Sequence, residues 1–294
     1  MTWVEIVAVA ALAGWVCVTL DRSRSWPTGA RLPIDSQQSI STSENSLAVI
    51  VPARNEADLL PETLTSLLRQ EIEGGKIYLV DDGSSDDTAA VARSLSVGTG
   101  SSMELEVLKA GPRPPGWSGK IHALEQGYQA VLADATRAGL DPPKWVLLTD
   151  ADIYHRNGSI ASLLLQAEPI SGGDSFDLVS VMARLRADSF WERVIIPAFV
   201  FFFQLLFPFR RVARPRSRVA AAAGGCVLVR RSVLKEAGGL AGVRGEIIDD
   251  VALAKAVKGA GGRTWLGFDP GICSLRSYSR LSGLWAMVSR TAFT

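Results

Sequence analysis

The sequence predicts an α/β protein with a mostly parallel sheet and flanking helices, preceded by an apolar N-terminal helix. Three observations support this prediction. From residue 47 onward, short apolar runs alternate with longer helical patterns, as in βαβ units. Polar turns follow three of these runs directly, where parallel strands end. The first twenty residues contain an almost uninterrupted apolar segment.

Residues 1–22 are expected to form a transmembrane anchor. At about 1.5 Å per residue, the apolar segment nearly crosses a bilayer core. A buried globular helix is the alternative, which the acidic residue Glu5 favours. Arg22, Arg24 and Arg31 follow the segment, so the positive-inside rule keeps the next domain in the cytoplasm. A cleaved signal peptide would instead carry basic residues before the apolar stretch.

Residues 23–46 are polar and rich in serine and threonine, which predicts a tether. The domain is expected to span residues 47–275. Its first strands are predicted at residues 47–51, 76–80 and 105–109, and helices at 56–70, at 88–95 and from about 120. A fully buried strand is predicted at residues 145–149. In the second half of the domain, a strand is predicted at 223–229, a helix at 250–258 and an extended segment at 264–268.

Residues 188–211 are interpreted as an interfacial apolar segment. Its most apolar part, residues 194–209, spans only about 24 Å as a helix, which is short for a bilayer crossing. A core helix is the alternative. Six phenylalanines and flanking arginines favour contact with lipid headgroups. The phenylalanines are Phe199, Phe201, Phe202, Phe203, Phe207 and Phe209, and the arginines are Arg184, Arg186, Arg193, Arg210 and Arg211.

Composition narrows the function classes. The 31 basic residues nearly balance the 30 acidic ones, so nothing indicates a nucleic-acid partner. The three cysteines lie far apart, without zinc or disulfide spacing, which favours a reducing compartment. No dinucleotide-binding glycine motif or complete P-loop is present. The two histidines, His122 and His155, are too separated for a convincing metal site or triad and are interpreted as structural.

Asp150 and Asp152 stand just beyond the buried strand, where two carboxylates can face one Mg²⁺ or Mn²⁺. The alternative is that such acids only cap the next helix. Asp81 and Asp82 open an acceptor-rich turn that can read a base or ribose, although ordinary turn chemistry also explains it.

Together, residues 51–56, 81–85, 150–152 and 249–253 resemble family 2 glycosyltransferases with the GT-A fold, and the ordered match extends over about residues 47–268. Residues 116–120, 190–209 and 220–231 are similar to the hopanoid-associated glycosyltransferases of bacteria.

This resemblance implies a set of donor-binding residues. They are Pro52, Ala53, Arg54 and Glu56 in the nucleotide pocket, Asp81 and Asp82 near the base, Lys120 near the phosphates, Asp150 at the ribose or metal, and Asp152 at the metal.

The resemblance also implies that Asp250 is the catalytic base. Family members usually show Glu-Asp here, so Asp249 departs from the pattern and its role stays open. The alternative is that both acids only complement the helix dipole. A single carboxylate base without an enzyme nucleophile implies inversion at the sugar carbon.

The expected function is therefore metal-dependent transfer of one sugar from a UDP- or GDP-sugar to a hopanoid or polyprenyl lipid. The expected location is the cytoplasmic side of the bacterial inner membrane. The Gln-x-x-Arg-Trp pattern of polymerising relatives is absent from residues 276–294, an expected amphipathic segment that can lead into further membrane helices. A nucleotidyltransferase and a non-catalytic membrane partner are the alternatives.

Overall fold

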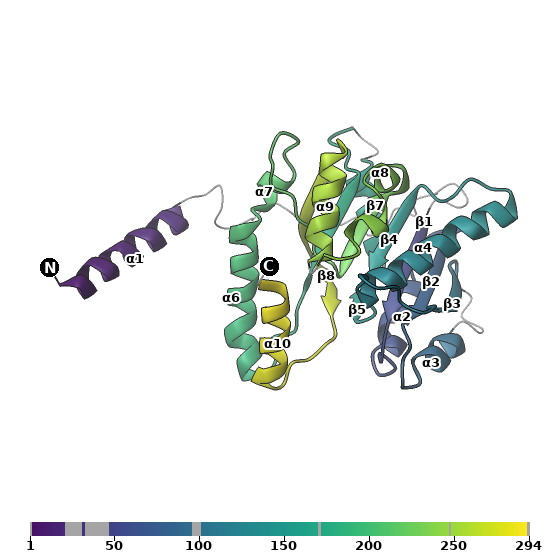
Figure 1. Ribbon diagram of the computed structural model, residues 1–294, viewed down its shortest axis with the longest axis horizontal. Helices are drawn as coiled ribbons and strands as arrows, with labels where there is room; N and C mark the ends of the chain where they lie inside the picture. The colour runs from purple at the N-terminus through teal and green to yellow at the C-terminus, as the bar shows by residue number, and fades with distance from the viewer. Residues whose placement is uncertain are drawn as a thin grey trace.

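The computed structural model describes residues 2–20, 31–32, 47–95, 101–169, 172–246 and 248–292. Apart from Arg31 and Leu32, the predicted tether therefore lies outside the described residues. An eight-stranded sheet in the order β3-β2-β1-β4-β7-β6-β8-β5 forms the centre of the domain (Figure 1).

The first half of the sheet is parallel, as the sequence predicts. It contains β1 (Leu47–Ala53), β2 (Lys76–Asp81), β3 (Glu104–Lys109) and β4 (Trp145–Thr149). The connecting helices are α2 (Leu60–Leu68), α3 (Thr88–Leu95) and α4 (Gly119–Ala138). Because these strands are parallel, their carboxyl ends meet along one edge of the sheet.

The second half is mixed, so the expectation of a mostly parallel sheet is wrong there. It contains β5 (Ile153–His155), β6 (Leu178–Arg184), β7 (Cys226–Arg230) and β8 (Thr264–Ser274). β7 runs antiparallel to both β4 and β6, and β5 runs antiparallel to β8, whereas β6 and β8 are parallel. The chain re-enters the sheet at the end where β6 stops, so β7 runs antiparallel to β6. An apolar run alone does not encode this direction.

Helices cover both faces of the sheet. One apolar core holds side chains from α2, α3 and α5 (Ser159–Ala167), and the other holds side chains from α4, α8 (Arg231–Glu236), η1 (Leu240–Val243) and α9 (Asp249–Gly259). Gly127 allows α4 to lie close to the sheet, because a Cβ there would stand 2.5 Å from Ile50 Cγ2. This close packing fixes the start of α4 at the carboxyl edge of the strands.

Three further helices lie at one end of the domain. They are α6 (Phe190–Leu206), α7 (Phe209–Val212) and α10 (Leu281–Ala292), and α6 and α10 pack side by side (Figure 1). The helix α1 (Trp3–Leu20) extends away from the domain, and Trp15 stacks on Phe201 with ring centroids 6.1 Å apart. By length and composition, residues Phe190–Val212 could cross a membrane, and Trp3–Cys17 forms a shorter apolar helix.

The six phenylalanines of the interfacial segment do not share one environment. Phe202 is 52% exposed, but Phe209 is only 3% exposed. Phe199, Phe203 and Phe207 pack against the same apolar cluster as Phe209. The phenylalanines therefore divide between the surface and the apolar cluster, because a helix directs only part of its circumference away from the domain.

Candidate functional site

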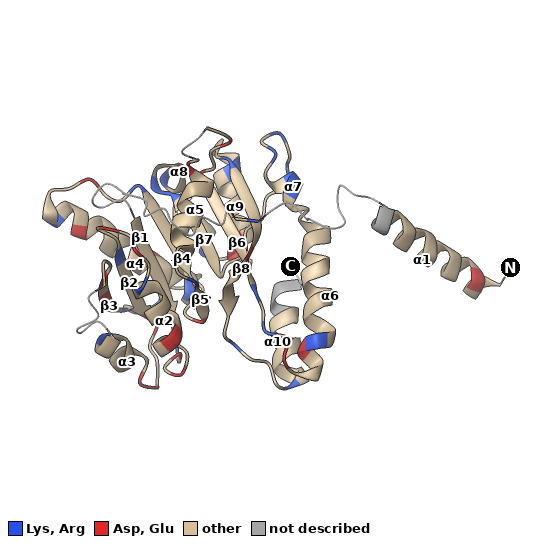
Figure 2. Ribbon diagram, turned by 180° about the vertical axis from the view of Figure 1, so that it is seen from behind, with Lys and Arg blue, Asp and Glu red and all other residues tan. Residues whose placement is uncertain are grey.

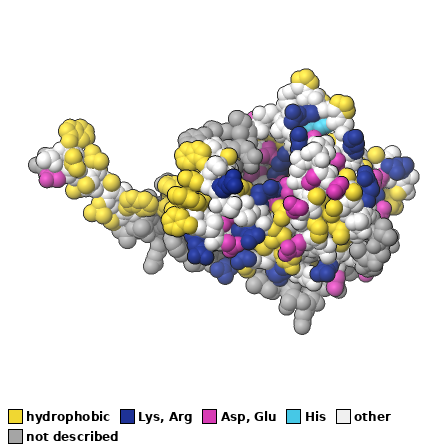
Figure 3. Space-filling model, turned by 90° about the horizontal axis from the view of Figure 1, so that it is seen from below, with side chains coloured by type: hydrophobic (Ala, Val, Ile, Leu, Met, Phe, Trp, Pro, Cys, Tyr) yellow, Lys and Arg dark blue, Asp and Glu magenta, His cyan; other side chains and the backbone are white. Residues whose placement is uncertain are grey.

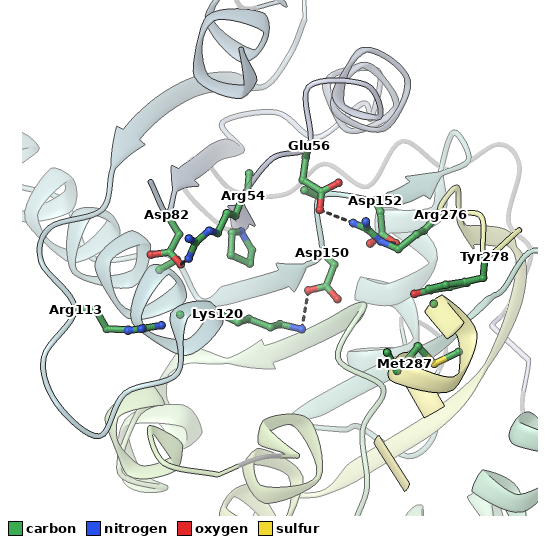
Figure 4. A pocket seen from close by; sticks show the side chains of 17 residues that line it. Arg54, Glu56, Asp82, Arg113, Lys120, Asp150, Asp152, Arg276, Tyr278 and Met287 are labelled. Atoms are coloured by element: carbon green, nitrogen blue, oxygen red, sulfur yellow. Dashed lines mark hydrogen bonds and ion pairs between the residues drawn. The ribbon is translucent and has the colours of Figure 1, made fainter. Parts of the chain in front are cut away.

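A cavity of about 700 Å³ opens at the carboxyl ends of β1, β2 and β4. Eight of the predicted residues line it, namely Pro52, Ala53, Arg54, Glu56, Asp82, Lys120, Asp150 and Asp152. Arg54, Asp82 and Arg113 lie at one end, Arg276, Tyr278 and Met287 lie at the other, and Asp150 lies between them (Figure 4).

Asp81 and Asp250 are not among the residues that line the cavity. Asp81 is buried, and its Oδ1 accepts a hydrogen bond from the Ser84 backbone N–H at 3.0 Å. It therefore shapes the turn that presents Asp82. Asp250 accepts a hydrogen bond from the Gly224 backbone, to which Lys120 also bonds.

Hydrogen bonds join the turn after β1 to the turn after β2. Asn55 adopts a left-handed conformation with φ of 56°, which its short polar side chain tolerates. Its backbone N–H donates to Ser84 Oγ at 3.0 Å, and its Oδ1 accepts from the Ser85 N–H at 2.8 Å. Beside this junction, Arg54 Nη1 lies 3.7 Å from Asp82 Oδ2. The two turns thus act as one platform for Arg54 and Asp82.

Lys120 joins α4 to the end of β4. Ser118 caps α4 by accepting from the Ile121 N–H at 3.3 Å, so Lys120 leaves the first turn beside the cavity. Its Nζ lies 2.6 Å from Asp150 Oδ1 and donates to the Gly224 carbonyl at 3.2 Å. Burial lowers the pKa of Lys120, but Asp150 and the neighbouring acids raise it more, so the ammonium stays charged.

Asp250 is the second residue of α9, and both it and Lys120 hydrogen-bond to the backbone of Gly224. Its Oδ2 accepts from the Gly224 N–H at 2.6 Å, and its Oδ1 accepts from the Val251 N–H at 2.7 Å. Burial and the adjacent Asp249 raise the pKa of Asp250 to about 6, against the opposing effect of Lys120. Gly224 needs to lack a side chain, because a Cβ would lie 3.0 Å from Lys120 Nζ and 3.2 Å from Asp250 Oδ2.

Several residues that line the cavity were missed by sequence reasoning. Arg276 forms an ion pair with Glu56, and its Nε lies 3.3 Å from Asp152 Oδ2, which also accepts from Ser274 Oγ at 2.7 Å. The one available signal was a basic residue directly after the last strand. Since 220 positions separate Arg276 from Glu56, only the order of the strands brings them together.

The charges that line the cavity are balanced. Four cationic side chains, Arg54, Arg113, Lys120 and Arg276, accompany four carboxylates, Glu56, Asp82, Asp150 and Asp152. A diphosphate that enters with a divalent cation would leave this balance almost unchanged.

Asp150 and Asp152 both line the cavity, where their carboxylates are available to such a cation. Among the described residues, no group of three or more His, Cys, Asp or Glu side chains is arranged to hold a metal. Asp150 and Asp152 would therefore supply two carboxylates, and phosphate oxygens and water would complete the shell, as is common for Mg²⁺.

The histidines have structural surroundings. His155 is fully buried, its Nε2 lies 2.9 Å from Thr149 Oγ1, and burial lowers its pKa to about 4. His122 is buried with its ring edge against Trp117.

Comparison with known proteins identifies the family. The sequence model of the family described as "Glycosyl transferase family 2" matches residues 48–238. A 4,4'-diaponeurosporenoate glycosyltransferase of Staphylococcus aureus is 36% identical over 130 residues, which cover 44% of this chain and 30% of that protein. An undecaprenyl-phosphate 4-deoxy-4-formamido-L-arabinose transferase of Sodalis glossinidius is 26% identical over 152 residues, which cover 51% of this chain and 40% of that protein. The chain thus matches less than half the length of either relative.

A solved structure shows the same fold. The mannosyltransferase of Pyrobaculum calidifontis in complex with GDP-Man and Mn²⁺ superposes with a TM-score of 0.64 at 21% identity, covering 97% of this chain and 72% of that one. Because the family model matches well over half of the chain and the architecture agrees, the chain belongs to glycosyl transferase family 2 and has an α/β fold of the GT-A type.

Proposed function

We propose that the protein is an inverting glycosyltransferase that moves one sugar from a UDP- or GDP-sugar to a hydroxyl of a membrane lipid. The observation that supports this most is the convergence of Lys120, Asp150 and Asp250 at the carboxyl edge of the sheet, beside a cavity with room for a nucleotide sugar.

The donor would lie along the cavity. Asp82, Arg54 and Arg113 would hold its nucleoside end, and the half-buried ammonium of Lys120 would meet the diphosphate. Asp150 and Asp152 would hold a divalent ion, which when bound would stabilise the departing diphosphate. The Pyrobaculum calidifontis mannosyltransferase was solved with GDP-Man and Mn²⁺, which supports a nucleotide sugar and a divalent ion as the ligands here.

Asp250 would accept the proton of the acceptor hydroxyl. As the hydroxyl oxygen bonds to the sugar carbon, the bond from that carbon to the diphosphate breaks, and its electron pair leaves with the diphosphate. A single displacement inverts the sugar carbon. The raised pKa of Asp250 suits a base, because a more basic carboxylate takes a proton more readily.

Two relatives are named for undecaprenyl-phosphate and diaponeurosporenoate, which supports a lipid acceptor here. The hopanoid or polyprenyl type of the lipid rests on the resemblance of residues 116–120, 190–209 and 220–231 to the hopanoid-associated enzymes.

α6 would lie in the membrane interface without crossing the bilayer. β6 before it and β7 after it pair in one sheet, so both ends of α6 must stay on the same side as the domain. Basic side chains occur at both ends, with Arg193 at the first and Arg210 and Arg211 just beyond the second (Figure 2). Such an apolar helix with basic ends fits an orientation along the headgroups.

α1 would reach the same bilayer as α6. The Leu32 N–H donates to the Phe268 carbonyl at 3.1 Å, and the Phe268 ring lies 4.9 Å from that of Phe209, just beyond α6. The chain therefore joins the domain near the end of α6. Hydrophobic side chains cover α1 and gather on the adjoining end of the domain (Figure 3). This arrangement supports location at the bacterial inner membrane, with the domain on the cytoplasmic side.

A donor screen tests the proposal against its alternatives. Membranes that contain the protein are supplied with Mn²⁺ and either UDP- or GDP-sugars or, in parallel, a nucleoside triphosphate with a sugar phosphate, and the released phosphates are identified. We expect a nucleoside diphosphate to be released. Release of pyrophosphate from a nucleoside triphosphate and a sugar phosphate would indicate nucleotidyl transfer, and donor binding without turnover would indicate a non-catalytic partner.

A further inference from the structure

Glu192 is a fully buried carboxylate that the proposed chemistry does not use. It lies in the first turn of α6 and accepts three backbone hydrogen bonds. Its Oε2 accepts from the N–H groups of Asp188 at 3.1 Å and Ser189 at 2.8 Å, which completes the capping box of the helix. Its Oε1 accepts from the Tyr278 N–H at 2.6 Å, across 86 positions of sequence.

Tyr278 belongs to a segment that we call the C-terminal strap, residues 275–280, which runs from β8 to α10. At one end, the Leu275 N–H donates to the Asp152 carbonyl at 2.9 Å. In its middle, Tyr278 is held by Glu192, and its carbonyl accepts from Ser189 Oγ at 3.3 Å. The strap therefore connects the turn that holds Asp150 and Asp152 to the start of α6.

The strap also carries side chains into the cavity. Arg276 points toward Glu56 and Asp152, and Tyr278 lines the wall beside it (Figure 4). Arginine side chains are flexible, so the position of the guanidinium depends on how firmly the backbone behind it is held.

We propose that Glu192 is a positioning residue for the donor site: by holding the strap at Tyr278, it keeps Arg276 against Glu56 and Asp152. This inference rests on the proposed function, since it assigns Arg276 to the diphosphate end of the donor. A buried carboxylate is costly unless its oxygens are satisfied, so the bond to Tyr278 holds the strap in one place.

The two roles of Glu192 can be separated by one substitution. In Glu192→Gln, the amide oxygen can still accept from Ser189 and Asp188, because glutamine also completes a capping box. The amide NH₂ group then faces the Tyr278 N–H, and two donors cannot bond. The helix cap survives, whereas the tie to the strap is lost.

The test measures the Kd of UDP and of GDP, each with Mn²⁺, for the full chain in membranes. We expect Glu192→Gln and Arg276→Ala each to raise the Kd of the nucleotide that the wild type binds by roughly tenfold, the scale of one hydrogen bond to a charged group. In the double variant, we expect no further increase beyond Arg276→Ala, because both changes remove the same contact. Glu62→Gln, an exposed acid in the first turn of α2, is the matched control and should leave the Kd unchanged.

Multiplying effects in the double variant, or an unchanged Kd in Glu192→Gln, would overturn the inference. If Glu192→Gln does not accumulate as folded protein, Ser189→Ala removes the second tie to Tyr278 and should give a smaller increase that also disappears in the Arg276→Ala background. A wild type that binds neither nucleotide would refute the proposed function itself, which distinguishes the two failures.

Discussion

At the scale of single residues, Asp250 differs from the other acids near the cavity. It accepts hydrogen bonds from two backbone N–H groups and, unlike Asp82, Asp150 and Asp152, does not line the cavity. We expect Asp250→Asn to lower transfer by roughly a hundredfold or more while the Kd of the donor stays unchanged, as for a lost general base. Single-turnover kinetics and donor binding check this. An equal loss of donor binding would make Asp250 a donor-site or structural residue instead.

The pKa of Asp250 predicts the pH dependence of the reaction. A base must be deprotonated, so kcat should rise as the pH increases through about 6 and level off above it. Asp249 raises this pKa, so Asp249→Asn should move the acidic limb of the profile to lower pH. A pH–rate profile of both proteins measures the shift, and a limb that does not move would assign it to another group.

Asp152 gives a prediction about the metal. Its carboxylate is oriented by Ser274 and Arg276 toward the cavity, where it would supply one charged oxygen to the ion. We expect Asp152→Asn to abolish transfer and to weaken donor binding strongly in the presence of Mn²⁺. Binding titrations with and without the metal measure this, and wild-type turnover that continues under a chelator would refute the metal claim.

Sequence reasoning found the residues that directly follow the parallel strands, because neighbouring parallel strands end at one edge of the sheet. Arg54, Asp82 and Asp150 are placed together for that reason. It missed Arg276, because β8 reaches the cavity through pairings with β6 and β5 whose directions an apolar run does not reveal. Glu192 could not have been found, since its partner lies 86 positions away.

At the scale of elements, α6 presents two kinds of aromatic side chain. Phe202 is 52% exposed, whereas Phe203 packs against the domain. We expect Phe202→Ser to weaken liposome binding with little effect on the thermal unfolding temperature, because the ring would lie in the interface. Phe203→Ser should instead lower the unfolding temperature, because it leaves a cavity in a packed cluster. Flotation with liposomes and thermal unfolding separate the two, and normal flotation of Phe202→Ser would contradict interfacial contact.

At the scale of the whole molecule, α1 and α6 would act on one bilayer. We expect a variant that lacks residues 2–20 and carries Phe202→Ser to lose liposome binding and transfer to lipid, while hydrolysis of the donor sugar continues. The reason is that the donor cavity lies in the domain, whereas access to the lipid would depend on both apolar elements. A folded variant that still binds liposomes and glycosylates lipid normally would refute the role of the membrane contact.

The position of α6 in the chain, between β6 and β7, also affects how the protein is synthesised. β7, which pairs with β4 in the centre of the sheet, follows α6 in the chain. The strap, which bonds to the first turn of α6, and α10, which packs against α6, also follow it. In a nascent chain, α6 therefore emerges before the segments that cover it, and apolar segments exposed in this way favour aggregation. If α1 has already brought the chain to a bilayer, the interface can receive α6 during this interval. We therefore expect synthesis without α1 to yield aggregated chains at this step, even where the finished domain is stable.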